Sequence, residues 1–316
     1  MPTHLLATTP VKDQGSSESC WIYAYLACME TERIEHYGDS LNLSPQWLER
    51  AFLKEQARQS YLTQGQWQVN MSNVGPEAER LLQDYGMVTY GNYCPSDMNT
   101  RVLARDIYNK VRIAVNAKAG LSRLGDIVEE SLPRLPHNLS EGFFLYGMHY
   151  TPQQFAQSLL HGVRFQWITS YTHHPYGTAF VLEIPDNRSR HAFHNVTLSQ
   201  FLKTTLQALR DRHPVYWEGD MRPVADRDPA IAADATGMTA SSIKKTAEAR
   251  QRAFERFSTT DQHAMAIVGI TSGRQPYLIC KNSWGKHWND NGFTLMSLRH
   301  FLLRTTFVGI PTTTDK

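Results

Sequence analysis

The order of helical and extended patterns along the chain limits the folds that it can adopt. In the first half, apolar spacing and helix-start signals predict helices at about 20–36, 46–58, 75–86, 99–118 and a short one from 151. In the second half, β-branched and aromatic residues predict strands at 165–171, 178–184, 215–217, 264–270, 277–281 and 292–298. Two more helices are expected at 198–212 and 241–257, after an exposed excursion at 223–240. Helices first and strands later indicate an α+β protein with a helical lobe and a β-rich lobe.

Size and composition are those of a globular protein. The 316 residues can bury a large core, and 41% hydrophobic with 20% charged residues exclude a disordered chain, a collagen and a coiled coil. The formal net charge of +2 is spread without a Lys/Arg block, so no nucleic-acid partner is expected. No apolar run is long enough to predict a membrane-spanning helix. A homo-oligomer is compatible with the sequence, but nothing indicates one.

The first 15 residues lack the basic start and the apolar run of a signal peptide. A cytoplasmic location is therefore expected, or a secreted or periplasmic one if a signal has been removed.

The four cysteines are too few for a disulfide scaffold. Cys28 and Cys280 are predicted to be buried small hydrophobic residues, and Cys94 a surface thiol.

Two short regions contain residue types suited to nucleophilic catalysis. Residues 11–21 read VKDQGSSESCW and place Gln14 six positions before Cys20, at the start of a predicted helix with Ser19 as its N-cap. Residues 261–285 begin with DQHA and end with KNSWG, so that Asn282 follows His263 by 19 positions. A lone Cys, His or Asn is most often structural. The combination of all four at these positions favours a catalytic site.

Together these regions resemble the papain superfamily of cysteine peptidases. The resemblance implies an α+β, papain-like two-lobed fold, with a helical lobe, a β-rich barrel-like lobe and the active site in the cleft between them. It implies one peptidase domain over residues 1–316. The helical lobe is expected mainly at 15–150 and the β-rich lobe mainly at 160–310, with residues 1–14 crossing to the β-rich lobe.

The resemblance gives each residue a role that its chemistry can fill. A catalytic thiol needs a lowered pKa, which a helix N-terminus and a nearby imidazolium can supply to Cys20. His263 is expected to act as the base, and Asn282 to orient it. Gln14 and the backbone N–H of Cys20 are expected to stabilise the oxyanion. Trp284 is expected to shield the bond between Asn282 and His263 from water.

The spacing indicates a branch of the superfamily. His263 and Asn282 follow Cys20 by 243 and 262 residues, whereas about 130–150 is usual in papain and the cathepsins. Such an insertion is typical of bleomycin hydrolase and the bacterial aminopeptidases C. GPEAERLLQDYG at 75–86 and PVYWEGD at 214–220 also resemble segments of that branch, as do the residues at 183–203 and those leading to His263.

Some expected substrate-binding residues depart from the family pattern. The expected set is Glu18, Trp21, Ser72, Asn73 and Trp284. At Glu18 the family usually has glycine beside the S1 subsite, and a carboxylate there could favour a cationic substrate group or point away. The family's Gly-Gly is not evident at 71–75, so the non-prime subsites are open to change.

No metal or cofactor is expected. His161 and the His173-His174 pair have no companion Cys, Asp or Glu at metal-ligand spacing. The resemblance implies hydrolysis of peptide bonds through a thioester acyl-enzyme, with a peptide as the partner. Three alternatives stay open: endopeptidase activity, acyl transfer to an amine, and a weakly active or non-catalytic relative that binds peptides.

Aminopeptidase activity is favoured on the resemblance alone. In bleomycin hydrolase-like enzymes a C-terminal arm lies in the cleft and its carboxylate binds the substrate's amino group. Here residues 311–316 are expected to be a short, frayed tail that cannot reach the cleft. The segments at 99–140 or 223–240 could block the cleft instead, and Glu18 could bind the amine.

Overall fold

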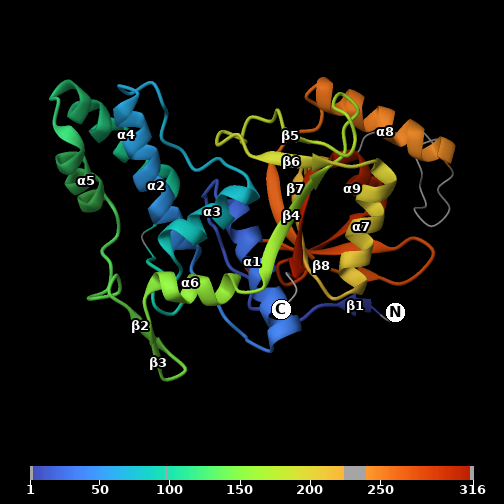
Figure 1. Ribbon diagram of the computed structural model, residues 1–316, viewed down its shortest axis with the longest axis horizontal. Coiled ribbons are helices and arrows are strands. Elements are labelled where there is room, and N and C mark those ends of the chain that lie inside the picture. Colours follow the sequence, from blue (N-terminus) through green and yellow to red (C-terminus); the bar gives the residue numbers. More distant parts are fainter. Residues whose placement is uncertain (1–2, 97, 224–239, 314–316) are drawn as a thin grey trace.

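The computed structural model describes residues 3–96, 98–223 and 240–313 (Figure 1). The helices are α1 (Cys20–Tyr37), α2 (Pro45–Leu62), α3 (Gly75–Tyr85), α4 (Thr100–Asn116), α5 (Gly120–Ser131), α6 (Pro152–Leu160), α7 (Leu198–Arg210), α8 (Ala240–Glu255) and α9 (Leu298–Arg304). The strands are β1 (Thr3–Leu5), β2 (Phe143–Leu145), β3 (Met148–Tyr150), β4 (Val163–Thr169), β5 (Ala179–Val181), β6 (Ala192–Asn195), β7 (Val215–Gly219), β8 (His263–Thr271), β9 (Tyr277–Lys281), β10 (Phe293–Ser297) and β11 (Thr305–Thr313).

The helices α1 to α6 gather on one side of the molecule, and a large sheet with α7, α8 and α9 forms the other (Figure 1). Among the described residues, the sheet has the order β10-β9-β8-β7-β11-β4-β6-β5, and β1 pairs with β8 beside this path. This is the predicted two-lobed α+β architecture, which is confirmed. The excursion predicted at 223–240 lies almost entirely outside the described residues.

Helix α1 forms the junction between the two lobes. All its side chains from Trp21 to Glu32 are buried, because it contacts α2 and α3 on one side and β7 and β8 on the other. The buried carboxylate of Glu30 is satisfied by the Lys12 ammonium at 2.5 Å and the backbone N–H of Leu43 at 2.7 Å. A helix held from every side gives its first residue, Cys20, a fixed position.

Most predicted helices and strands are present, with shifts at their ends. The sequence analysis did not predict α5, α9, the β2–β3 hairpin or the strands β1, β6 and β11. Ser19 does occupy the N-cap position of α1, but its hydroxyl donates to Glu49 instead of capping the helix. Cys28 and Cys280 are buried and Cys94 is exposed, and all four cysteines are free, as predicted.

The prediction of a frayed tail at 311–316 is wrong for residues 311–313, and residues 314–316 lie outside the described structure. Strand β11 continues to Thr313, and residues 311–313 pair with 163–165 of β4. The β-sheet ladder satisfies the backbone groups that a free tail would leave to water. The C-terminal segment is therefore held in the sheet as far as it is described.

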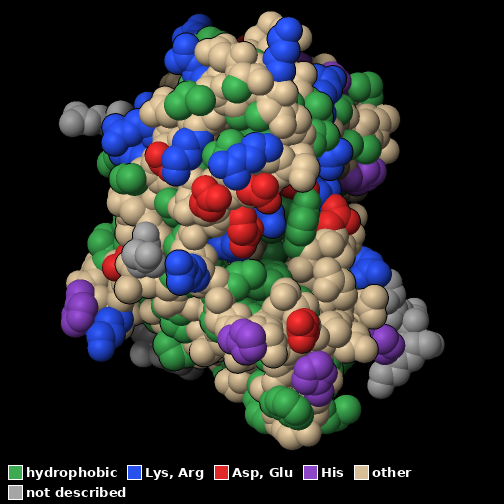
Figure 2. All heavy atoms as spheres, turned by 90° about the vertical axis from the view of Figure 1, so that its left-hand side faces the viewer, with side chains coloured by type: hydrophobic (Ala, Val, Ile, Leu, Met, Phe, Trp, Pro, Cys, Tyr) green, Lys and Arg blue, Asp and Glu red, His purple; other side chains and the backbone are tan. Residues whose placement is uncertain are grey.

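The β2–β3 hairpin projects from the helical lobe. It lies at the lower end of the molecule in Figure 1 and again in Figure 2, where hydrophobic side chains gather at its tip. Phe144, Tyr146 and Met148 are its exposed hydrophobic residues. Elsewhere on the face in Figure 2, acidic and basic side chains are interspersed. No helix in the described part of the chain is long and apolar enough to cross a membrane.

Candidate active site

Cys20 lies where the two lobes meet. It is the first residue of α1, so its backbone N–H has no partner within the helix. Its thiol accepts hydrogen bonds from the backbone N–H groups of Ala264 and Trp21. Ala264 directly follows His263 at the start of β8. The contact therefore brings the thiol to the strand end that carries the predicted base.

His263 and Asn282 come together because β8 and β9 are neighbouring strands. Nε2 of His263 lies 2.8 Å from Oδ1 of Asn282, the residue directly after β9. The backbone N–H of Ser283 donates to the same Oδ1, at 2.8 Å, which identifies this atom as the acceptor. Nε2 must then carry the proton. In the neutral ring this leaves Nδ1 free to accept a proton from a nucleophile.

Trp284 covers this pair. Its ring centroid lies 4.6 Å from that of His263, with the planes tilted by 32°, and Trp288 packs edge-on against it. The side chains of His263 and Asn282 are buried, although Trp284 itself is partly exposed. A hydrogen bond under such a cover is exchanged with water less readily than an open one.

The electrostatic surroundings differ from those expected for a thiolate. Burial raises the pKa of Cys20 to about 12, and the carboxyl groups of Glu218 and Asp186 add to the rise. Burial also lowers the pKa of His263 to about 4, although the bond to Asn282 opposes this shift. Both shifts run opposite to the lowered thiol pKa that the sequence analysis expected. They favour the uncharged forms of Cys20 and His263 at neutral pH.

Gln14 is positioned by the segment after β9. Its backbone N–H donates to the carbonyl of Ser283 at 2.8 Å, and its Oε1 accepts from the Ser283 hydroxyl at 2.5 Å. Its Nε2 donates to the carbonyl of Ser17 at 2.6 Å, which uses one of its two protons. The second proton is available to another acceptor.

The expected substrate-binding residues occupy different environments. Trp21 is buried beneath the 71–75 loop and donates its indole N–H to the carbonyl of Met71 at 2.7 Å. Asn73 is also buried and donates to Ser189 at 3.1 Å. Ser72 is half-buried and donates to the carboxylate of Asp186. Trp21 can thus support the loop but cannot present its ring to a ligand.

Glu18 points into a shallow space between the 68–71 segment and α4. It borders a cavity of about 320 Å³, together with Asn70 and Tyr108. Arg101 of α4 forms an ion pair with Glu18 at 3.0 Å. Both side chains are exposed, so the pair contributes little to stability. The pair still reduces the charge that Glu18 would offer to a cationic substrate group.

The sequence analysis missed three carboxyl groups that interact with one another, two of which, Glu218 and Asp186, also interact with Cys20. Glu218 lies on β7, Asp261 lies two residues before His263, and Asp186 lies in the connection between β5 and β6. They come from distant segments, and only Asp261 could have been noticed in the sequence, because it lies two residues before the predicted base.

Two clusters of side chains that could hold a metal also occur among the described residues. They are Glu32, His36 and His213, and His173, His174 and Glu183. The expectation that the His173-His174 pair lacks an acidic companion is therefore wrong.

Comparison with known proteins bears on the family and on the fold. Residues 222–303 match the family model described as papain family cysteine protease. The chain is similar to PepW of Lactobacillus rhamnosis HN001, with 17% identity and a TM-score of 0.66, covering 98% of this chain and 81% of that one. It is similar to digestive procathepsin L 3 of Tenebrio molitor larval midgut, with 14% identity and a TM-score of 0.44, covering 98% and 67%. No curated protein matches it.

The fold and the family match point to one class of protein. The chain has a papain-like fold, and residues 222–303 carry the sequence pattern of the papain family of cysteine proteases. In these two respects the chain is similar to papain-like cysteine peptidases.

Proposed function

We propose that Cys20 is the nucleophile and His263 the base of a peptide-bond hydrolase. The observation that carries this proposal is the hydrogen bond from His263 Nε2 to Asn282 Oδ1. It lies at the start of β8, where the backbone N–H of Ala264 also contacts the Cys20 thiol. Because both groups start uncharged, His263 Nδ1 accepts the thiol proton as the sulfur attacks the substrate carbonyl. The new S–C bond gives a tetrahedral oxyanion, which receives hydrogen bonds from Gln14 and from the Cys20 N–H.

The remaining steps use the same groups. The protonated His263 donates its proton to the leaving amine, and the C–N bond breaks to leave a thioester on Cys20. Neutral His263 then removes a proton from water, which attacks the thioester and releases the acid and the thiol. Asn282 keeps the imidazole in one orientation during both transfers. No cofactor takes part in this sequence of steps.

We further propose that the enzyme is an aminopeptidase of the bleomycin hydrolase and aminopeptidase C type. The proposal is supported by the long spacing between Cys20 and His263 and by the segments at 75–86 and 214–220. We assign residues 15–150 mainly to the helical lobe and 160–310 mainly to the β-rich lobe. In this assignment residues 1–14 cross to the β-rich lobe, as the pairing of β1 with β8 supports.

Endopeptidase activity is the second candidate. One observation favours it: residues 311–313 are paired in β11 and are not available as an arm in the cleft. If no other segment fills the cleft, a longer peptide could pass through it and be cut internally.

A pair of matched substrates separates the two candidates. We expect leucine or arginine aminomethylcoumarin to be cleaved faster than its N-acetylated counterpart, because an aminopeptidase recognises the free amino group. The release of fluorescence measures both rates, and the Cys20→Ala variant gives the background. Preference for the acetylated substrates would defeat the aminopeptidase proposal and leave an endopeptidase.

A further inference from the structure

The connection between β5 and β6 crosses from the sheet to the helical lobe. We call residues 182–191 the crossing loop. Its Arg188 donates to the carbonyl of Gln68 at 3.0 Å and to Oδ1 of Asn70, and its guanidinium lies over the Trp67 ring at 4.1 Å. Cation–π stacking of this kind adds to the hydrogen bonds in holding the loop against the helical lobe.

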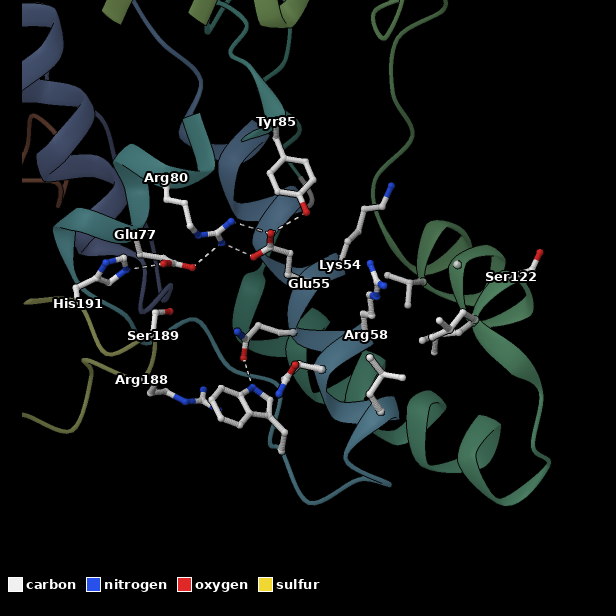
Figure 3. Close-up of a pocket in the computed structure, with 18 residues that line it drawn as sticks. Lys54, Glu55, Arg58, Glu77, Arg80, Tyr85, Ser122, Arg188, Ser189 and His191 are labelled. Carbon is white, nitrogen blue, oxygen red and sulfur yellow. Dashed lines mark hydrogen bonds and ion pairs between the residues drawn. The ribbon is translucent and has the colours of Figure 1, made fainter. Parts of the chain in front are cut away.

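Two further contacts extend the attachment. Ser189 accepts a hydrogen bond from Asn73 at 3.1 Å, and His191 Nε2 lies 2.7 Å from the buried carboxylate of Glu77 on α3. Figure 3 shows His191 pointing at Glu77, with Ser189 and Arg188 following along the loop. Arg188, Ser189 and His191 also line a cavity of about 1100 Å³ with residues of α2 and α5. The crossing loop is thus anchored along the helical lobe over several residues.

The crossing loop also contacts the segment expected to face the substrate. Ser72 donates to the carboxylate of Asp186, and the Asp186 carboxyl group interacts electrostatically with Glu18 and with the Cys20 thiol. The loop therefore passes the cleft on the side of Ser72 and Glu18. A peptide chain that extended beyond this point would meet the loop.

Acidic groups meet on the same side. The backbone N–H of Asp186 donates to Oδ2 of Asp261 at 2.8 Å, and the two carboxyl groups repel each other. Glu218 interacts electrostatically with both and with Cys20, so its carboxyl group faces the pair. Its Oε2 accepts from Tyr216, the backbone N–H of Gly75 also interacts with its carboxyl group, and burial raises the pKa of Glu218 well above its usual range. Burial therefore favours the neutral form of this carboxyl group, whereas a cationic ligand beside it would favour the charged form.

The described part of the protein does not neutralise these three groups with an ion pair. No Lys or Arg within it forms a salt bridge to Asp186, Asp261 or Glu218. Arg188 is close to Asp186 in sequence, but its guanidinium donates to Asn70 and Gln68 instead. Glu18, the other acidic candidate, is paired with Arg101.

We propose that the crossing loop closes the non-prime side of the cleft and that Asp186, supported by Asp261 and Glu218, binds the free α-amino group of the substrate. An ammonium group has three donors and one positive charge, which match a cluster of carboxyl oxygens beside the nucleophile. The proposal rests on the proposed peptidase function. It assigns the amine-binding role to a loop inside the fold and not to a C-terminal arm.

The charge state of Asp186 should make recognition of the amine depend on pH. Burial and the repulsion from Asp261 and Glu18 raise its pKa to about 7, although Ser72 and Arg188 oppose the rise. Asp186 is therefore charged above pH 7, whereas a peptide α-amino group loses its charge above about 7.7–8.0. We expect KM for free-amine substrates to be lowest between these values and to rise on both sides.

Binding to a catalytically inactive enzyme tests the proposal directly. In the Cys20→Ala background, we expect a short peptide with a free amino terminus to bind at least about tenfold more tightly than its N-acetylated twin. Adding Asp186→Asn should remove this preference. Glu183→Gln, which changes an exposed carboxylate on the same loop, should leave it intact. Isothermal titration calorimetry measures all six affinities, those of two peptides for three proteins.

Several outcomes would overturn the proposal. One is a preference for the free amino terminus that survives Asp186→Asn. Another is equally tight binding of an acetylated peptide with lysine at its first position, which would mean that the acidic groups bind a substrate side chain and not the α-amino group.

Arg188→Ala provides a second test that does not depend on Asp186. It removes the contacts with Trp67, Gln68 and Asn70, and cleavage of an acetylated hexapeptide by the otherwise intact enzyme should rise severalfold. No rise would contradict closure by the loop. Because binding needs no turnover, failure of hydrolysis alone leaves this test valid.

Discussion

Replacing Cys20 by alanine is expected to lower kcat for peptide substrates by on the order of 10⁴-fold or more, since it removes the nucleophile. The thermal midpoint should change little, because the thiol is uncharged in the folded protein and alanine continues the helix. Turnover of a fluorogenic peptide and a thermal melt of the same samples measure the two effects.

Cys94→Ala is the matched control for this substitution. Cys94 is exposed and lies outside the catalytic region, so its loss should leave kcat unchanged. If Cys20→Ala retained substantial activity while folded, Cys20 would not be the nucleophile. If Cys94→Ala lost activity instead, the exposed thiol would have to be considered in its place.

Gln14→Ala is expected to lower kcat by about 10²–10³-fold with little change in KM. The amide proton that remains on Nε2 donates to charge that develops only as the carbonyl is attacked, so its loss affects the transition state more than substrate binding. Steady-state kinetics with a peptide aminomethylcoumarin separates kcat from KM.

The contacts of Gln14 supply the control for this experiment. Ser283→Ala removes the hydroxyl that donates to Gln14 Oε1 but leaves the Nε2 donor in place. It should therefore reduce kcat much less than Gln14→Ala. A Gln14→Ala enzyme with wild-type kcat would exclude Gln14 from the oxyanion site, and equal effects of both variants would indicate a role in positioning only.

The predicted catalytic residues were accessible to sequence analysis because their signals are local. A helix start fixes the place of Cys20, and Asn282 reaches His263 because two consecutive strands pair side by side. The free cysteines followed from their surroundings in the same way. Each of these features depends on neighbours within a few residues or on one strand pairing.

The features that the sequence did not predict depend on distant contacts. Three acidic residues come together from a loop, a strand and the start of another strand: Asp186, Glu218 and Asp261. The hydrogen bond from the backbone N–H of Asp186 to the carboxylate of Asp261 joins residues that are 75 positions apart. The raised thiol pKa follows from burial and from the charges of Glu218 and Asp186, which no local pattern reveals. Trp21 was expected to face the substrate, but the 71–75 loop covers it.

The C-terminal strand shows how pairing can override composition. Residues 311–313 are proline and threonines, which suggested a frayed tail, yet they extend β11 along β4. Their extended conformation follows from pairing with residues 163–165 of β4. This pairing could be recognised only once the order of the strands was known.

Trapping the acyl-enzyme tests the central claim most directly. The enzyme is mixed with excess 4-nitrophenyl ester of an amino acid with a free amino group, quenched in acid within its first turnovers, and digested for mass spectrometry. Because nitrophenolate leaves readily, the thioester should form faster than it is hydrolysed and accumulate. The account predicts one acyl adduct, on the peptide containing Cys20, and none in the Cys20→Ala variant. Cleavage of the ester without an adduct on Cys20, or an adduct on another residue that persists in Cys20→Ala, would contradict it.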